Sequence, residues 1–338
     1  MNKKIGLFLP YFGQFPNYFR LWIKSVAINP EIQFILITDQ NLTATLPSNL
    51  RVIKKEFKDI QRLIKNKFNK LDISLDSPYK LCDFKPAYGY IFDNLIEKYG
   101  LDYWGFCDPD VIWGRISEFL KKKSFYEKNY DKVGYLGHFQ FFSVKEKMLF
   151  TEIIDDEKFR NYKYVFTHKY AYHFDEEIGI GLIAKKKNLN ILSFEDEPPH
   201  ADILINSYQF YTYKNASDFS LPRYFNWNEQ YGLTQVTYDG CIYKMTPKIY
   251  VHLQKRNMDV KINQFSKEYY IIPNEFISTD QFHQIDLSKT LQDQFYLDFY
   301  VNKIEKLIKK FSIGQIKHTY HFQKLLDSYY KQKGGKND

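Results

Sequence analysis

The chain has 338 residues, of which 44% are hydrophobic and 26% are charged, and its formal net charge is +8. It is too hydrophobic to be disordered, and 15 Gly and 12 Pro are too few for a fibrous or low-complexity protein. Most of the net positive charge lies in residues 302–338, which hold nine Lys and three acidic residues. Such a tail is typical of a segment that meets an anionic partner, with membrane lipid ahead of nucleic acid. The alternative is a solvated pair of basic helices.

The spacing of the cysteines and the lengths of the apolar runs indicate in which cellular compartment the protein is expected. Cys82, Cys107 and Cys241 are far apart and form no Cys-x-x-Cys pair, so their spacing indicates neither a zinc site nor a disulfide framework. The first apolar run stops at Pro10, which is too short for a signal peptide, and no run of 18 apolar residues follows. We therefore expect a cytoplasmic protein, soluble or peripheral on the inner face of the membrane.

The first 110 residues alternate between patterns typical of buried strands and of amphipathic helices. The predicted strands are 5–9, 32–37 and 103–107, and the predicted helices are 17–28, 58–68 and 85–99. Repeated units of this kind predict an α/β fold, a Rossmann-like mixed, mainly parallel sheet flanked by helices. Ligands bind such sheets at the carboxyl ends of the strands, which here precede Tyr11, Asp39 and Asp108.

The rest of the chain is more mixed. We predict strands over 133–137 and 139–144, a helix that begins near Asp175, a hairpin with a turn at Asp239-Gly240, and a last strand over 248–253. Two amphipathic helices are expected from residue 287 onward. The predicted organisation is therefore one main domain, 1–286, followed by a basic helical appendage, 287–338.

Two carboxylates flank Pro109 directly after the predicted strand 103–107. Asp108 and Asp110 are two residues apart on an extended segment, so both side chains point to one side and can approach one divalent cation. A strand-to-loop turn is the alternative, for which Asp-Pro-Asp is also well suited. We predict a metal site here.

A histidine and two basic residues close the predicted strand 248–253. His252 can supply a further metal ligand, and Lys255 and Arg256 can balance the charge of a diphosphate. The alternative is a histidine at a strand end beside a solvated basic pair.

An acidic run, Asp175-Glu176-Glu177, begins the predicted middle helix. Acidic residues at this position commonly cap the helix. One of these carboxylates could instead bind or deprotonate a hydroxyl group of an acceptor.

The segment 78–88 is rich in polar groups for a helix entrance. Lys80, Asp83 and Lys85 could contact the ribose or phosphates of a nucleotide. Asp83 is equally well explained as a helix N-cap with Pro86 in the first turn.

Several other chemistries lack their signatures. The chain contains no P-loop, dinucleotide-binding glycine motif, nucleophile elbow or His-Glu-x-x-His motif. Nucleic-acid modules are not indicated either, so no nucleic-acid partner is expected.

Taken together, several motifs resemble a bacterial group of GT-A-type glycosyltransferases encoded in capsule and lipopolysaccharide gene clusters. The order of motifs is also similar to the glycogenin and lipopolysaccharide-galactosyltransferase pattern. The resemblance covers roughly residues 1–260 and depends on IGLFLPYFGQFP (5–16), PYKLCDFKPAYGY (78–90), WGFCDPD (104–110), Gly137-His138, Phe174-Asp175-Glu176 and HLQKR (252–256).

The resemblance implies a role for each motif. The implied ligands of Mn²⁺ or Mg²⁺ are Asp108, Asp110 and His252. The residues implied to bind the nucleotide or its phosphates are Tyr11, Asp39, Lys80, Asp83, Lys255 and Arg256. Those implied to face the donor sugar and the acceptor are Gly137, His138, Asp175, Glu176 and Glu177. Pro109, and HLQKR in place of a longer His-Gly-Lys-Pro-Trp arrangement, depart from the pattern.

The implied activity is metal-dependent transfer of a hexose from a nucleotide sugar, UDP-linked, to a hydroxyl of a capsule or lipopolysaccharide precursor, free or lipid-linked. An inverting enzyme would need a base such as Asp175 or Glu176, whereas a retaining one would not. Two alternatives are a non-catalytic basic protein that binds polyanions, and a degenerate GT-A fold that binds UDP-sugar without turnover.

Overall fold

A computed structural model describes residues 3–43, 45–193, 200–203, 210–211, 223–238, 243–254, 256–263 and 265–285. The chain divides into two compact units, and all of the described residues belong to the first unit, which comprises residues 1–203 together with 209–286. The helices expected over 287–338, the turn expected at Asp239-Gly240, and Lys255 lie outside the described residues.

The largest sheet among the described residues has seven strands in the order β3-β2-β1-β4-β7-β6-β8. Its first four strands are parallel, β7 pairs antiparallel with β4 and β6, and β8 is parallel to β6. This arrangement confirms the predicted α/β class with a mixed, mainly parallel sheet. The strands are β1 (Ile5–Pro10), β2 (Ile32–Thr38), β3 (Leu50–Lys54), β4 (Tyr103–Cys107), β6 (Lys132–Leu136), β7 (Phe139–Ser143) and β8 (Ile191–Leu192).

Two smaller sheets follow the orders β10-β9-β14-β5 and β13-β12-β11-β16-β17-β15. The first contains β5 (Val111–Trp113), β9 (His200–Ile203), β10 (Phe210–Tyr211) and β14 (Tyr250–His252). The second contains β11 (Arg223–Asn228), β12 (Gly232–Tyr238), β13 (Tyr243–Lys248), β15 (Asp259–Val260), β16 (Glu268–Ile272) and β17 (Glu275–Ile277). The expectation that the strand over 248–253 is the last was wrong. Both residues of β15 are exposed, and β16 buries only some of its residues, so neither shows the continuous apolar run of a central strand.

The predicted helices 17–28 and 58–68 are confirmed, whereas the predicted helix 85–99 is interrupted. There the chain forms a 3₁₀ helix, which contains Pro86, and two short α-helices that meet at Phe92, where the backbone is not helical (φ −109°, ψ 29°). The α-helices are α1 (Phe19–Ala27), α2 (Phe57–Lys67), α3 (Tyr88–Ile91), α4 (Asp93–Tyr99), α5 (Ile116–Lys122), α6 (Tyr162–Thr167), α7 (Leu182–Lys186) and α8 (Thr279–His283). The 3₁₀ helices are η1 (Pro78–Ala87), η2 (Val144–Glu146) and η3 (Leu149–Thr151), and η4 (Glu177–Gly181) is a π-helix.

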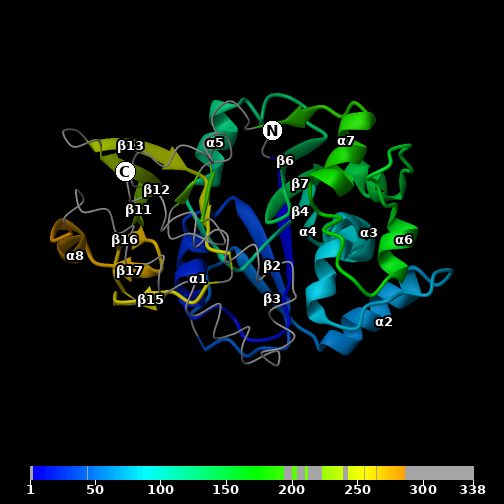
Figure 1. The fold of residues 1–338 in the computed structure, drawn as a ribbon, viewed down its shortest axis with the longest axis horizontal. Helices are drawn as coiled ribbons and strands as arrows, with labels where there is room; N and C mark the ends of the chain where they lie inside the picture. Colours follow the sequence, from blue (N-terminus) through cyan, green and yellow to red (C-terminus); the bar gives the residue numbers. More distant parts are fainter. Residues whose placement is uncertain are drawn as a thin grey trace, which may run out of the picture. The chain divides into compact units, whose positions relative to one another are not determined.

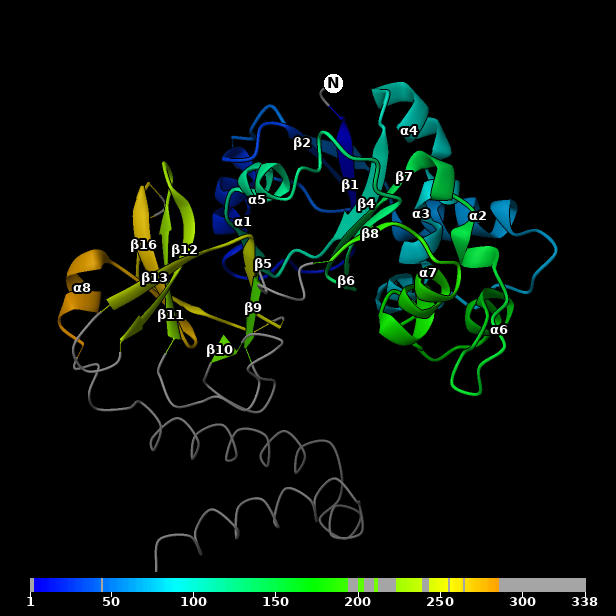
Figure 2. The same ribbon diagram turned by 90° about the horizontal axis from the view of Figure 1, so that it is seen from above.

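Alternating side chains of the large sheet serve two separate cores. Phe8 of β1 packs with α2, α3 and α4 on one face, whereas Leu7 packs with α1 and α5 on the other (Figure 1). Helix α1 is apolar on both sides, since Trp22 packs against the seven-stranded sheet and Leu21 packs with Trp227 of β11 in the six-stranded sheet (Figure 2). In the part of the chain that is described, no helix combines the length and apolarity needed to cross a bilayer.

Candidate functional site

The sheet register brings three predicted site residues to one edge. Phe8 of β1 pairs with Phe106 of β4, so Tyr11, which follows β1, is level with Pro109, the residue between Asp108 and Asp110. Cys107 pairs with Phe139 of the antiparallel strand β7. His138 therefore precedes β7 beside Asp108, whose N–H donates to the His138 carbonyl at 3.3 Å. This edge is the carboxyl end of the parallel strands, where ligands of such sheets gather.

Asp108, Asp110 and His252 converge at this edge. One ligand atom from each lies within 4.8 Å of the others, and His252 Nε2 is 3.4 Å from Asp110 Oδ2. The antiparallel pairing of β14 with β5 places His252 opposite Val111, and Leu253 N–H donates to the Asp110 carbonyl at 2.8 Å. Two carboxylates and an imidazole suit Mn²⁺ or Mg²⁺, so the residues present fit the implied cation.

The His138 ring stacks on the His252 ring, with centroids 4.1 Å apart and planes 26° apart. Both side chains are buried, and Tyr250 meets the His138 ring edge-on at 5.2 Å. This packing restricts the orientation of the His252 imidazole toward Asp110. His138, predicted to face the donor sugar, is thus packed directly behind a candidate metal ligand.

Lys85 connects the carboxylate pair to the acidic helix start. Its Nζ lies 2.8 Å from Asp108 Oδ1 and 3.0 Å from Asp175 Oδ2, and it donates to the Gly137 carbonyl at 2.8 Å. Burial by itself lowers the pKa of Lys85, but the Asp108 and Asp175 carboxylates outweigh it and raise the pKa well above its ordinary value. Lys85 is therefore a fixed positive charge between two acidic groups.

Asp175 and Glu176 lie beside this ammonium. Burial raises the pKa of Asp175 to about 7, against the opposing effect of Lys85 and with additional increases from Glu176 and Asp108. Burial also raises the pKa of Glu176, which the Gly137 backbone partly offsets. Glu176 precedes the π-helix as its N-cap residue, but its side chain makes no capping hydrogen bond, so the capping interpretation is wrong for Glu176.

Gly137 is required by close packing of these carboxylates. A Cβ at this position would lie 2.5 Å from Asp175 Oδ2 and 2.6 Å from Glu176 Oε1. Any side chain here would displace both carboxylates, so the site needs glycine at this point of the β6–β7 connection.

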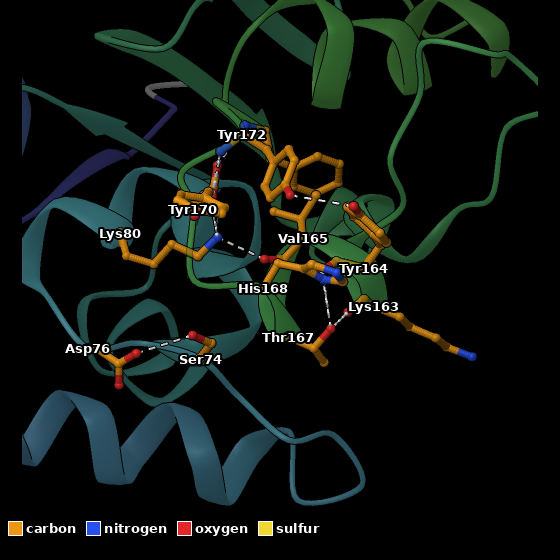
Figure 3. Close-up of polar contacts among 12 residues, drawn as sticks. Ser74, Asp76, Lys80, Lys163, Tyr164, Val165, Thr167, His168, Tyr170 and Tyr172 are labelled. Atoms are coloured by element: carbon orange, nitrogen blue, oxygen red, sulfur yellow. Dashed lines mark hydrogen bonds and ion pairs between the residues drawn. The ribbon is translucent and has the colours of Figure 1, made fainter. Parts of the chain in front are cut away.

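Lys80 and Asp83 have a different environment from the one predicted. They form a buried ion pair of 2.6 Å, with side chains 3% and 0% exposed. Lys80 Nζ also donates to the carbonyls of Val165, at 2.8 Å, and Tyr170 (Figure 3). Because the pair is enclosed by the segment that includes α6 and the residues after it, the prediction that these side chains line a nucleotide is corrected to a structural role.

Asp83 fixes the end of the same segment. Its carboxylate accepts the N–H groups of Tyr172, at 2.9 Å, and Phe174, at 3.0 Å. It lies inside η1, whose N-cap residue is Ser77, so the N-cap interpretation of Asp83 is wrong as well. Lys80 and Asp83 thus hold the chain that leads directly into Asp175.

The remaining nucleotide-side predictions have mixed outcomes. Tyr11 is half-buried, and burial, with Asp110 and Asp108, raises its pKa, which is consistent with a phenol near both carboxylates. Asp39 follows β2 and accepts from the Gln40 side chain at 2.8 Å. Arg256 donates to Asn274 Oδ1 at 3.0 Å, so its guanidinium is engaged with the β16–β17 turn.

A match to a sequence family covers residues 7–280, and the family is described as a family of unknown function, DUF6625. The chain belongs to this family. No curated protein matches it. Among solved structures, the crystal structure of A197 from STIV is 13% identical, with a TM-score of 0.24, and covers 56% of this chain and 80% of its own. A likeness at this level supports no statement about fold or activity.

The buried Lys80–Asp83 pair predicts a large loss of stability on substitution. Lys80→Met leaves the Asp83 charge buried without its ammonium partner, which typically costs about 3–5 kcal/mol. Urea denaturation measures this loss. The matched control is Lys67→Met, since Lys67 and Asp93 form an ion pair of similar length that is partly exposed and should be worth about 1 kcal/mol or less. An equal effect of the two substitutions would contradict the structural role.

From the raised pKa of Asp175 we predict that the difference in stability between the wild type and Asp175→Asn depends on pH. Its folded pKa of about 7 lies above the ordinary value of 3.8, so folding favours the protonated form. Wild-type stability from this group is therefore present below about pH 4 and is lost as the pH rises through about 7. Asp175→Asn does not titrate, so its stability relative to the wild type should increase across that range. Denaturation of both proteins at several pH values gives the difference in their free energies of unfolding, in which groups that titrate identically in the two proteins cancel. A difference that stays constant with pH would refute the prediction.

Proposed function

We propose that the chain is a metal-dependent glycosyltransferase that moves a hexose from a nucleotide sugar, UDP-linked, to a hydroxyl of a capsule or lipopolysaccharide precursor. The observation that carries the proposal is the convergence of Asp108, Asp110 and His252 beside Lys85 and Asp175. Cleavage of a sugar–diphosphate bond needs a cation at the leaving group and a carboxylate on the acceptor side, and this cluster offers both kinds of residue.

The sheet supports a GT-A-like arrangement as the finer description of the fold. Four parallel strands, β3-β2-β1-β4, end at the edge where Tyr11 and Asp39 follow their strands. A nucleotide at this edge would lie next to the carboxylate pair, as ligands of open α/β sheets do.

In the proposed mechanism, Asp108, Asp110 and His252 would hold the divalent cation, which supplies Lewis-acid stabilisation of the leaving diphosphate when it is bound. Lys85 contacts Asp108 through Oδ1 and so helps to fix the orientation of this carboxylate. Asp175, which is buried, or Glu176, which is partly buried, would bind the acceptor hydroxyl beside Gly137 and, in an inverting reaction, accept its proton. A retaining reaction would use them for binding alone.

The acceptor is proposed to be a glycan or lipid-linked glycan. Contact with an anionic membrane surface through residues 287–338 and a cytoplasmic location belong to the same proposal. The membrane contact depends on the basic tail, which lies outside the described residues.

The metal site predicts cation-dependent binding of the donor. UDP-hexose with Mn²⁺ should stabilise the wild type by about 2.7 kcal/mol at a ligand concentration one hundred times its Kd. Asp110→Asn should lose this gain, because Asp110 is a buried member of the cluster. A thermal-shift panel of UDP-, GDP-, CMP- and dTDP-sugars, with and without Mn²⁺, measures the effect.

The matched control is Asp76→Asn, which changes an exposed carboxylate and should keep the full shift. Manganese-dependent stabilisation that survives in Asp110→Asn would contradict the metal assignment. If no donor stabilises the protein, and nucleic acid binds with steep salt dependence, the polyanion-binding alternative would replace the proposal.

Gly137 predicts a defect in transfer rather than in donor binding. Gly137→Ala should push Asp175 and Glu176 from their positions, and a displacement of about 1 Å typically lowers turnover roughly 10²-fold. The measurement is sugar transfer or donor hydrolysis, with the Mn²⁺-dependent thermal shift as the control for donor binding. Unchanged turnover would show that neither carboxylate acts in the reaction.

A further inference from the structure

A second group of potential metal ligands includes Asp175, the other carboxylate that Lys85 contacts. Cys82, His173 and Asp175 each offer one ligand atom, and these atoms lie within 4.8 Å of one another. Sulfur, imidazole nitrogen and carboxylate oxygen are the ligands of Zn²⁺ in proteins, and three protein ligands leave one coordination position open. Cysteine spacing did not indicate this group because its members come from η1 and from a segment about ninety residues later.

The Asp175 carboxylate has an oxygen available for a ligand. The side chain is 4% exposed, and its Oδ2 is the oxygen next to Lys85. Its Oδ1 is buried and accepts no hydrogen bond from the described residues. A buried acceptor without a donor costs about 1–3 kcal/mol, so a cation at this oxygen would remove an existing penalty.

One buried carboxylate, Asp83, positions all three ligands. Asp83 follows Cys82 directly, and it accepts the N–H groups of Tyr172 and Phe174, the two residues that flank His173. Phe174 in turn precedes Asp175. His173 itself has a left-handed backbone, with φ of 54°, which the two flanking hydrogen bonds hold in place. The ligand set is therefore built on a fixed backbone, as a metal site requires.

The two ligand sets differ in their chemistry. Asp108, Asp110 and His252 offer two carboxylates and one imidazole, which suit Mn²⁺ or Mg²⁺, whereas a thiolate selects a softer ion. Lys85 contacts one carboxylate of each set and lies between them.

We infer that Cys82, His173 and Asp175 form a site for a thiophilic divalent cation such as Zn²⁺. Binding displaces the Cys82 thiol proton, together with the Asp175 proton where that carboxyl group is protonated, to solvent and forms a bond from the cation to each of the three side chains. The consequence for activity depends on the proposed function. An ion at this site engages Asp175, so it would withdraw that carboxylate from the acceptor and inhibit transfer.

Co²⁺, which reports thiolate ligation through a charge-transfer absorption band, tests the site in the full-length protein. We expect the band in the wild type and its loss in Cys82→Ser. His173→Ala should weaken Co²⁺ binding by more than about tenfold, since even residues that only support a ligand typically cost about 10–100-fold. The matched control is His168→Ala, a histidine on the same segment that is not in the ligand group, which should keep the band.

Two further measurements decide the outcome. Asp110→Asn should retain the band, because Asp110 belongs to the first ligand set; this result separates the inference from the proposed function. In the unmodified protein, Zn²⁺ should slow alkylation of Cys82, located by mass spectrometry, which needs no variant that could misfold. Absence of the band in the wild type, its survival in Cys82→Ser, or alkylation of Cys82 that Zn²⁺ does not slow would each overturn the inference.

Discussion

The arrangement of acidic groups at the sheet edge depends on one buried ammonium. Asp108 and Asp175 come from segments almost seventy residues apart, and like charges this close would repel each other strongly in a low-dielectric interior. Lys85 lies within 3.0 Å of both and bonds the Gly137 carbonyl as well. It therefore joins the end of β4, the β6–β7 connection and the start of η4 at one point, and it contacts one carboxylate of each candidate ligand set.

The sequence was informative where local periodicity and burial agree. Continuous apolar runs identified β1, β2 and β4, because central parallel strands are buried on both faces. The residues at the carboxyl ends of these strands follow from the topology, so the position of Asp108 and Asp110 at this edge of the sheet could be predicted from the sequence. The position of His252 could also be anticipated from its place on a strand that returns to the same region.

The sequence was uninformative about side chains whose hydrogen-bond partners lie far away in the sequence. Lys80 and Asp83 are polar residues at a helix entrance, a pattern that fits ligand binding and capping equally well. Their actual partners are backbone groups of residues 165–174, which only the tertiary structure brings near. The same reason hid the group formed by Cys82 and His173, whose spacing matches no short metal motif. Strands β15 to β17 were missed because they are short and partly exposed, so their hydrophobic pattern is weak.

The pairing of β14 with β5 has a consequence for how the protein folds. Asp110 and His252 are about 140 residues apart in sequence, so their contact closes a long loop and belongs to the non-local contacts that slow folding. A ligand that needs all three residues of this set can bind only chains in which that closure has occurred. Such a ligand would act as a selective probe of completed folding, since any partly folded form with only the first half of the chain in place would lack the imidazole.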